Sequence, residues 1–296
     1  MGRGTYTDIP RHLNAAMRIV RLRLLDRPWS LRRPFDRLAV ESVLYQIFLV
    51  ATGSWSNPCQ MDDHFDDKFW LEAEQLLAKS NLYPGRSISF NSPVIGVPLA
   101  LFRVVLSLKR IYQNPEQFDQ ETMEALRSEV EEWEGVVLSE GELDSPDEHQ
   151  NCHPGIYRDA GYLYILVSSL LMDQISVGHW APGAPRVAPP DSWQLKKAKE
   201  ILRGRQDDPE WSRCFIGNWP VYSLGFFLEE DDIDLIRRDM HNRWMAVKFS
   251  QISRFRDDLE VTWAARGYGF DASVYSKSLA MVTPSSVRRT WMDLQD

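Results

Sequence analysis

Cysteine is scarce in this chain, and its spacing excludes two common kinds of small-protein scaffold. Three cysteines occur among 296 residues, at Cys59, Cys152 and Cys214, with separations of 93 and 62 residues. A disulfide framework or a zinc ribbon needs more cysteines, and a zinc ribbon also needs closely spaced pairs. We therefore expect free, buried thiols in a reducing compartment.

Long apolar runs, phosphate-binding loops and regular strand patterns are also missing. The most apolar stretch runs from Gly161 to Met172 and is interrupted by Ser168 and Ser169. A bilayer span needs about 20 apolar residues, so this stretch predicts a buried helix and no membrane association. The sequence contains no nucleophile elbow, phosphate loop or dinucleotide fingerprint, and no serine or cysteine nucleophile can be paired with a histidine.

The charge of the chain is acidic overall and unevenly distributed. The formal net charge is −8, but residues 1–37 carry nine arginines against three aspartates, so the remainder carries −14. An acidic surface repels phosphate backbones, and we expect no direct contact with nucleic acid. The basic start is compatible with a nucleic-acid arm or a transit peptide, but an amphipathic helical arm over 1–34 is favoured. Its apolar side chains recur at helical spacing: Leu13, Met17, Val20 and Leu24.

The remaining sequence is rich in large apolar side chains that recur with helical periodicity. Apolar residues make up 44% of the chain, with eleven Trp, ten Tyr and thirteen Phe, which is enough for an extended core. We predict an all-α fold, a multi-helical bundle or irregular helical array with a large aromatic core, in one domain over 35–296. Expected helices cover 35–51, 98–112, a segment started by Asn114-Pro115 and reaching 137, 157–177, 195–202 behind a Ser192 cap, and 226–266 as one long helix or two abutting helices.

Four segments, taken in order, are similar to a known family. They are Asn91–Pro98, Tyr157–Tyr164, Trp211–Tyr222 with its Asn218-Trp219-Pro220 centre, and Arg243-Trp244 behind an acidic helix start. Their order resembles the C-terminal fungal-specific transcription factor domain that follows a binuclear zinc cluster. The resemblance extends from about residue 35 to residue 265.

The resemblance implies a helical regulatory domain that contacts partner proteins, forms homodimers and in some relatives senses a small ligand. It also implies a place in the nucleus or cytoplasm and a role in transcription regulation, including that of secondary metabolism. The family's DNA-binding module needs six closely spaced cysteines to hold two zinc ions, and this chain has no such run. DNA recognition is therefore not carried over.

Aromatic side chains are the candidates for a ligand site, with plain core packing as the alternative. A pocket for a small apolar ligand in a helical domain would be lined by aromatic side chains with a few polar tips. The structural account of Asn218-Trp219-Pro220 is an Asx turn followed by a proline in a first helical turn. The candidate ligand-binding residues are Tyr162, Tyr164, Trp219, Tyr222, Phe226 and Trp244.

An acidic cluster supplies an alternative, enzymatic interpretation. Asp62, Asp63 and Asp66 share a helix face and could hold Mg²⁺ on a diphosphate, as in terpene-type cyclases or isomerases. That chemistry needs a second metal motif, but the nearest register, from Asp208, has Pro209 in place of the second acid and lacks the final glutamate. A solvated acidic turn is the favoured interpretation, with no metal and no catalytic residue assigned.

The loop around His149, Cys152 and His153 has spacing that could bind a soft metal, but no second ligand pair stands out elsewhere. A surface loop is the better interpretation. Three hypotheses remain open: a regulatory or ligand-sensing module, an enzyme with an aromatic cavity, and a scaffolding protein with a filled core.

Overall fold

The computed structural model describes most of the chain between residues 33 and 268. The described residues are 15–16, 18–20, 31, 33–53, 55, 67–80, 82–83, 91–92, 94–141, 143, 154–178 and 183–268. Within these ranges the regular secondary structure is helical and no strand occurs. The predicted all-α fold is confirmed. Most of the predicted basic arm, and the acids Asp62, Asp63 and Asp66, lie outside the described residues.

The first part of the fold is organised around a buried carboxylate. Glu41 accepts hydrogen bonds from Ser92 Oγ at 2.6 Å and from the backbone N–H groups of Val94 and Ile95, and it pairs with Arg37 at 2.7 Å. These bonds compensate for the removal of the charge from water. Glu41 thereby holds in place the irregular segment that precedes the helix starting at Ala100. The helices here are α2 (Pro34–Thr52), α3 (Asp67–Ala78) and α5 (Ala100–Gln113).

The middle of the chain forms two helices, and the start of the first differs from the prediction. The predicted cap and proline at Asn114-Pro115 open only a short 3-10 turn, η2 (Pro115–Gln117). The α-helix is capped instead by Asp119, whose side chain accepts a hydrogen bond from Thr122 N. The two helices are α6 (Gln120–Leu138) and α7 (Pro154–Ser176).

The last part of the fold contains short helices followed by a helical hairpin. Ser192 caps its helix as predicted, by accepting from Leu195 N. The segment 226–266 forms two helices, because Lys248 adopts the left-handed conformation with φ 52° and turns the chain. The elements are α8 (Trp193–Gly204), α9 (Pro209–Arg213), η3 (Phe215–Gly217), α10 (Asn218–Leu224), η4 (Glu230–Asp232), α11 (Ile233–Val247) and α12 (Ser250–Ala265).

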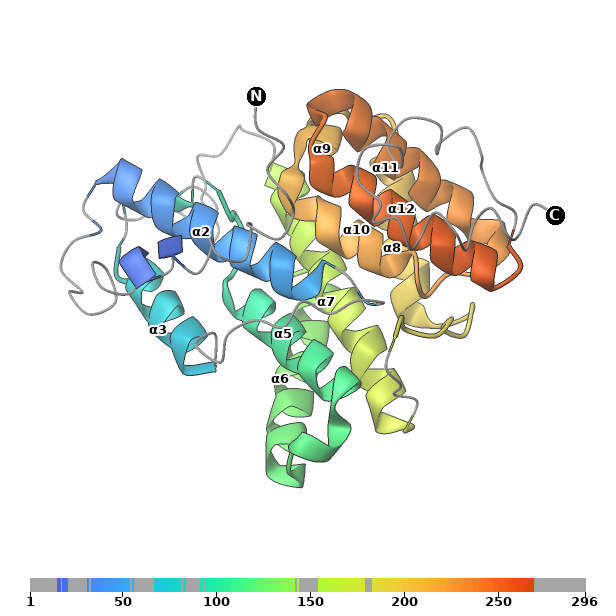
Figure 1. The fold of residues 1–296 in the computed structure, drawn as a ribbon, viewed down its shortest axis with the longest axis horizontal. Helices are drawn as coiled ribbons and strands as arrows, with labels where there is room; N and C mark the ends of the chain where they lie inside the picture. Colours follow the sequence, from blue (N-terminus) through green and yellow to red (C-terminus); the bar gives the residue numbers. More distant parts are fainter. Residues whose placement is uncertain are drawn as a thin grey trace.

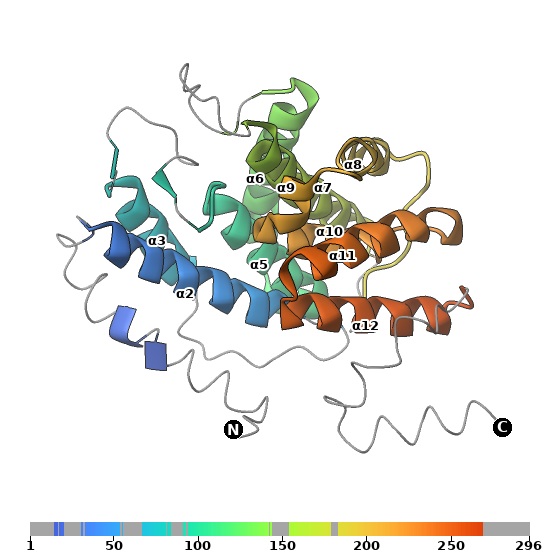
Figure 2. The same ribbon diagram turned by 90° about the horizontal axis from the view of Figure 1, so that it is seen from above.

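Helix α7 lies in the middle of the molecule. Figure 1 shows it between α5 and α6 on one side and α8 and α10 on the other. Helix α2 lies across α5, and its C-terminal end meets the start of α12 (Figure 2). Nearly every residue of α7 from Ala160 to Met172 is buried, in agreement with the prediction of a core helix. No helix among the described residues is both long and apolar enough to span a bilayer.

Candidate functional site

The buried aromatic cluster at the centre of the fold contains two of the candidate ligand-binding residues. Tyr164 of α7 stacks on Trp219 of α10 with ring centroids 5.3 Å apart, and Phe48 of α2 stacks on Phe102 of α5 at 4.2 Å. Phe48 also meets Trp219 edge-on at 5.1 Å. All four rings are inaccessible to solvent, and Trp219 Nε1 donates to the carbonyl of Thr52. These rings pack four helices together.

Tyr222 and Phe226 belong to a second aromatic group, against α12. Tyr222 stacks on Phe255 with centroids 4.1 Å apart, and Phe226 meets Tyr222 edge-on at 5.1 Å. The Tyr222 hydroxyl donates to the carboxylate of Asp258. Burial, and next the negative charge of Asp258, raise the pKa of Tyr222 well above its usual value. The phenol therefore stays protonated and serves as a hydrogen-bond donor.

The other two candidates lie elsewhere. Tyr162 of α7 is buried and donates to the carbonyl of Gly141 at 2.6 Å. Trp244 is half-buried near the end of α11, with Lys248 Nζ 5.4 Å from its ring centroid. The six predicted residues thus lie in two separate aromatic groups and at two further positions, and they do not line a common pocket. Their role in binding a ligand stays a prediction.

The segment Cys214–Asn218 belongs to one of the four segments that carry the family resemblance, and side chains from three helices hold it in place. Arg243 of α11 donates to the Cys214 carbonyl at 2.6 Å, and Tyr45 of α2 donates to the Phe215 carbonyl at 2.7 Å. Tyr164 of α7 donates to the Ile216 carbonyl at 3.2 Å. Since buried carbonyls need partners, these three contacts allow an irregular segment to cross the interior.

Arg243 is the most deeply buried cation of this region. It pairs with Asp239, donates to Asn218 Oδ1 at 3.1 Å and lies over the ring of Trp211 at 4.5 Å. Asn218 thus accepts from Arg243 instead of closing the predicted Asx turn. A side chain at position 217 would place its Cβ 2.9 Å from Arg243 Nη2, which explains the glycine there. The i, i+4 spacing of Asp239 and Arg243 is the signal in the sequence that could have revealed this pair.

Of the three cysteines, Cys214 lies among the residues that the structure describes. Cys214 is a free, buried thiol, and burial raises its pKa, which disfavours the nucleophilic thiolate. Cys59, Cys152, His149 and His153 lie outside the described residues, as do the acids proposed for Mg²⁺. Within the part of the chain that the structure describes, no group of three or more His, Cys, Asp or Glu side chains could hold a metal ion.

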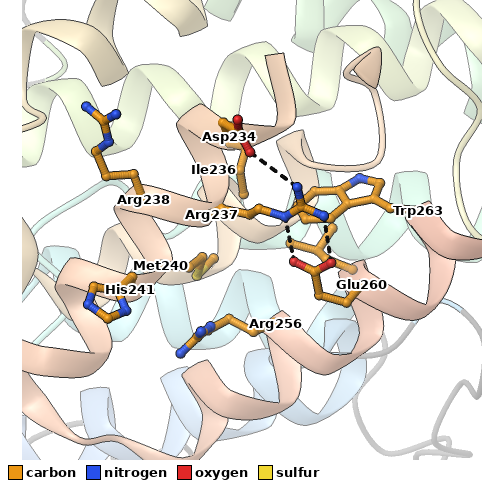
Figure 3. Close-up of a pocket in the computed structure, with 10 residues that line it drawn as sticks. Asp234, Ile236, Arg237, Arg238, Met240, His241, Arg256, Glu260 and Trp263 are labelled. Atoms are coloured by element: carbon orange, nitrogen blue, oxygen red, sulfur yellow. Dashed lines mark hydrogen bonds and ion pairs between the residues drawn. The ribbon is translucent and has the colours of Figure 1, made fainter. Parts of the chain in front are cut away.

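A cleft of about 340 Å³ lies between the two helices of the C-terminal hairpin. We call it the α11–α12 cleft, and Figure 3 shows its lining. It is open to solvent on one side, and its apolar lining side chains are themselves almost fully buried. The lining residues are Asp234, Ile236, Arg237, Arg238, Met240, His241, Arg256, Leu259, Glu260 and Trp263.

One part of the α11–α12 cleft is occupied by an ion-pair network. Arg237 contacts both carboxylate oxygens of Glu260, each at 2.8 Å, and Asp234 at 3.2 Å (Figure 3). The Arg237 guanidinium also lies 5.3 Å from the ring centroid of Trp263. Because Glu260 is 2% exposed, this two-point contact compensates a buried charge and joins α11 to α12. Both acids of the cleft therefore interact with Arg237.

The other part of the α11–α12 cleft carries basic side chains. In Figure 3, His241 and Arg256 lie near Met240, and Arg238 projects from α11 farther from them. Arg238 and His241 are exposed. These residues were not predicted from the sequence, because a cleft between two helices depends on how the helices pack. The basic spacing along 237–241, with Arg256 on the next helix, is the only signal that the sequence contains.

A second cleft, of about 310 Å³, lies between α7 and α8 and has a balanced charge. Arg205 contacts Asp159 at 2.7 Å and Asp208 at 2.9 Å, and Lys197 contacts Glu140 at 3.0 Å. Its positive and negative side chains thus neutralise one another. This cleft offers less to a charged ligand than the α11–α12 cleft does.

Comparison of the chain with protein-family models, curated proteins and solved structures finds no match.

Proposed function

We propose that this protein is a regulatory module that acts through contacts with other proteins and lacks a DNA-binding motif of its own. The proposal follows from the resemblance to the fungal transcription factor domain and includes regulation of transcription in the nucleus or cytoplasm. Secondary metabolism is one process that such a regulator would control. Partner proteins and a second copy of the chain are the expected contacts.

The observation that supports the proposal is that the candidate aromatic rings are packed in the core, whereas the α11–α12 cleft lies elsewhere, at the surface. Tyr164, Trp219 and Tyr222 are inaccessible to solvent. Their polar groups donate hydrogen bonds to the Ile216 carbonyl, the Thr52 carbonyl and the Asp258 carboxylate, respectively. The α11–α12 cleft, in contrast, is open and lined by charged side chains. Sites for small apolar ligands enclose most of the ligand in an apolar lining, whereas polar open clefts suit protein surfaces.

The enzymatic alternative needs a metal site and an aromatic cavity. Its acids Asp62, Asp63 and Asp66 lie outside the described residues. The aromatic side chains that would shelter a reactive substrate pack against each other, and this packing favours the regulatory proposal. A cyclase or isomerase that uses Mg²⁺ therefore stays a prediction. Incubation with prenyl diphosphates and Mg²⁺, with Asp62, Asp63 and Asp66 replaced together by Ala, tests it directly.

A reporter assay tests the proposed function. The full chain is fused to an unrelated DNA-binding domain, and the output of a reporter gene is compared with that of the DNA-binding domain alone. We expect a several-fold change in output from the fusion at equal protein abundance. An unchanged output in a fusion shown to be folded by limited proteolysis contradicts the proposal.

A binding assay with the isolated chain provides the complementary test. We expect no sequence-specific DNA binding at physiological salt, because the chain is acidic and has no zinc-cluster cysteines. Tight binding that discriminates between DNA sequences would overturn the proposal.

A further inference from the structure

We propose that the α11–α12 cleft binds an acidic peptide segment of a partner protein. This inference depends on the proposed function, because it assigns the partner contact to one surface. It follows from the local charge, from the position of the basic side chains on both helices and from the shape of the cleft.

The charge of the α11–α12 cleft is opposite in sign to that of the chain. Its lining contains three arginines against the two acids Asp234 and Glu260, a formal charge of +1 with histidine counted as neutral, whereas the chain carries a formal net charge of −8 on the same convention. Both acids already interact with Arg237. A basic patch attracts an acidic partner.

The basic side chains outside the ion-pair network lie on both helices of the α11–α12 cleft. Arg238 and His241 are three residues apart on α11, which is about 4.5 Å along the helix axis. Arg256 lies on α12 and lines the same cleft. A peptide with several carboxylates can contact side chains on both helices, whereas a single small anion cannot.

The shape of the α11–α12 cleft favours a peptide over a small apolar molecule. Ile236 and Met240 at the floor are fully buried by their own neighbours, and Leu259 and Trp263 are each 1% exposed. A ligand therefore gains little apolar contact from the floor and depends on the charged rim. Because a single exposed ion pair contributes about 1 kcal/mol or less, several must act together, as they do along a peptide.

Fluorescence anisotropy with short labelled peptides tests the proposal. The probe has Glu or Asp at every second position and Leu between them, and its neutral counterpart has Gln and Asn at the acidic positions. We expect the unmodified full chain to bind the acidic probe, with an affinity that falls as salt rises. Failure to bind the acidic probe at low salt, or equal binding of the neutral peptide, would overturn the proposal.

Two matched double variants locate the binding. Arg238→Glu with Arg256→Glu reverses two charges of the cleft, and Lys68→Glu with Arg127→Glu makes the same change of charge on α3 and α6, away from the hairpin (Figure 2). We expect the cleft variant to lose about tenfold in affinity, as reversal of a few close charge pairs does, and the remote variant to keep its affinity. Circular dichroism confirms that both are folded.

Three outcomes would contradict this location. Equal loss in the two double variants indicates an effect of net charge alone, and unchanged affinity of the cleft variant places the probe elsewhere. Millimolar citrate is also tested as a competitor of the probe. If citrate displaces the probe from the unmodified protein but not from the cleft variant, the cleft is a site for small organic anions. Any of these results overturns the assignment of an acidic peptide to the α11–α12 cleft.

The reporter assay separates failure of this inference from failure of the proposed function. If the fusion carrying Arg238→Glu and Arg256→Glu keeps its reporter output, the regulatory function stands and the assignment of the cleft is wrong. If the unmodified fusion has no output while the peptide binds as expected, the cleft assignment stands and the regulatory function is wrong.

Discussion

At the scale of single residues, buried charges organise irregular parts of the chain. Arg243 is inaccessible to solvent and connects α11 to the segment before α10 through Cys214 and Asn218. Glu41 does the same for the segment before α5 by accepting from Ser92, Val94 and Ile95. Both side chains pair with backbone groups that a regular helix would pair within itself, and Tyr45 and Tyr164 assist Arg243 in this.

Replacement of Arg243 should be strongly destabilising. In Arg243→Met the Asp239 carboxylate remains buried without its cation and the Cys214 carbonyl loses its donor. Removal of one partner of a buried pair costs about 3–5 kcal/mol. Urea unfolding followed by circular dichroism measures the loss. The exposed Arg213→Met, which breaks only a surface pair with Glu210, should change the free energy of unfolding by about 1 kcal/mol or less.

A second variant separates the buried pair from other effects at this position. Asp239→Leu combined with Arg243→Met removes both charges, so it should recover part of the stability lost in the single variant. Equal stability of the single variant and the unmodified protein would show that Arg243 is not needed for the fold.

At the scale of elements, the hairpin of α11 and α12 combines tight packing with charge. Arg237 and Glu260 join its helices, while Tyr222 and Phe255 attach α12 to α10. Asp257 of α12 is partly withdrawn from water. Burial raises its pKa to about 6, with smaller contributions from the charges of Asp258 and Glu260 and an opposing one from Arg256.

Asp257 should make the stability of the protein depend on pH. Because its pKa is higher in the folded chain than the unfolded value near 3.8, its protonated form favours folding at low pH. This contribution is full below about pH 4 and is lost as pH rises through 6. Asp257→Asn keeps a neutral side chain, so it should be more stable than the unmodified protein at pH 7 and nearly equal at pH 4.

Urea unfolding of both proteins at several pH values between these limits measures the difference. A difference in free energy that is the same at pH 4 and at pH 7 would contradict the role of Asp257.

At the scale of the whole molecule, α7 connects the two sides of the fold. It packs against α5 and α6 on one side and against α8 and α10 on the other (Figure 1). Tyr164 on this helix contacts Phe48 and Phe102 from the first part of the chain and Trp219 from the last part. The described core residues form one continuous hydrophobic cluster.

Unfolding should therefore be a single cooperative transition. Tryptophans of both sides, such as Trp70 on α3 and Trp263 on α12, are buried in the same core cluster, so their fluorescence should change together with the helical signal. We expect coincident urea midpoints by tryptophan fluorescence and far-ultraviolet circular dichroism. Two separate transitions would indicate that α7 does not couple the sides.

The amino-acid sequence determined the helical class and most of the helix positions. The apolar periodicity of 157–177, the absence of Gly and Pro from 226–266 and the cap at Ser192 are local signals, and local hydrogen bonding decides whether a segment is helical. The start of α6 was wrongly assigned to Asn114, because an equally good cap follows at Asp119 and only the packed chain selects between them.

Only the tertiary structure decided which side chains meet. The aromatic residues that the sequence offered for a pocket lie in separate packed groups, because each ring is placed by the helix that carries it and by the partners of that helix. The α11–α12 cleft combines residues of two helices that Lys248 folds back on each other. The charges of the lining residues can be read from the sequence, but the location of the cleft cannot. A cleft depends on the distance between two packed helices and not on the periodicity of either helix.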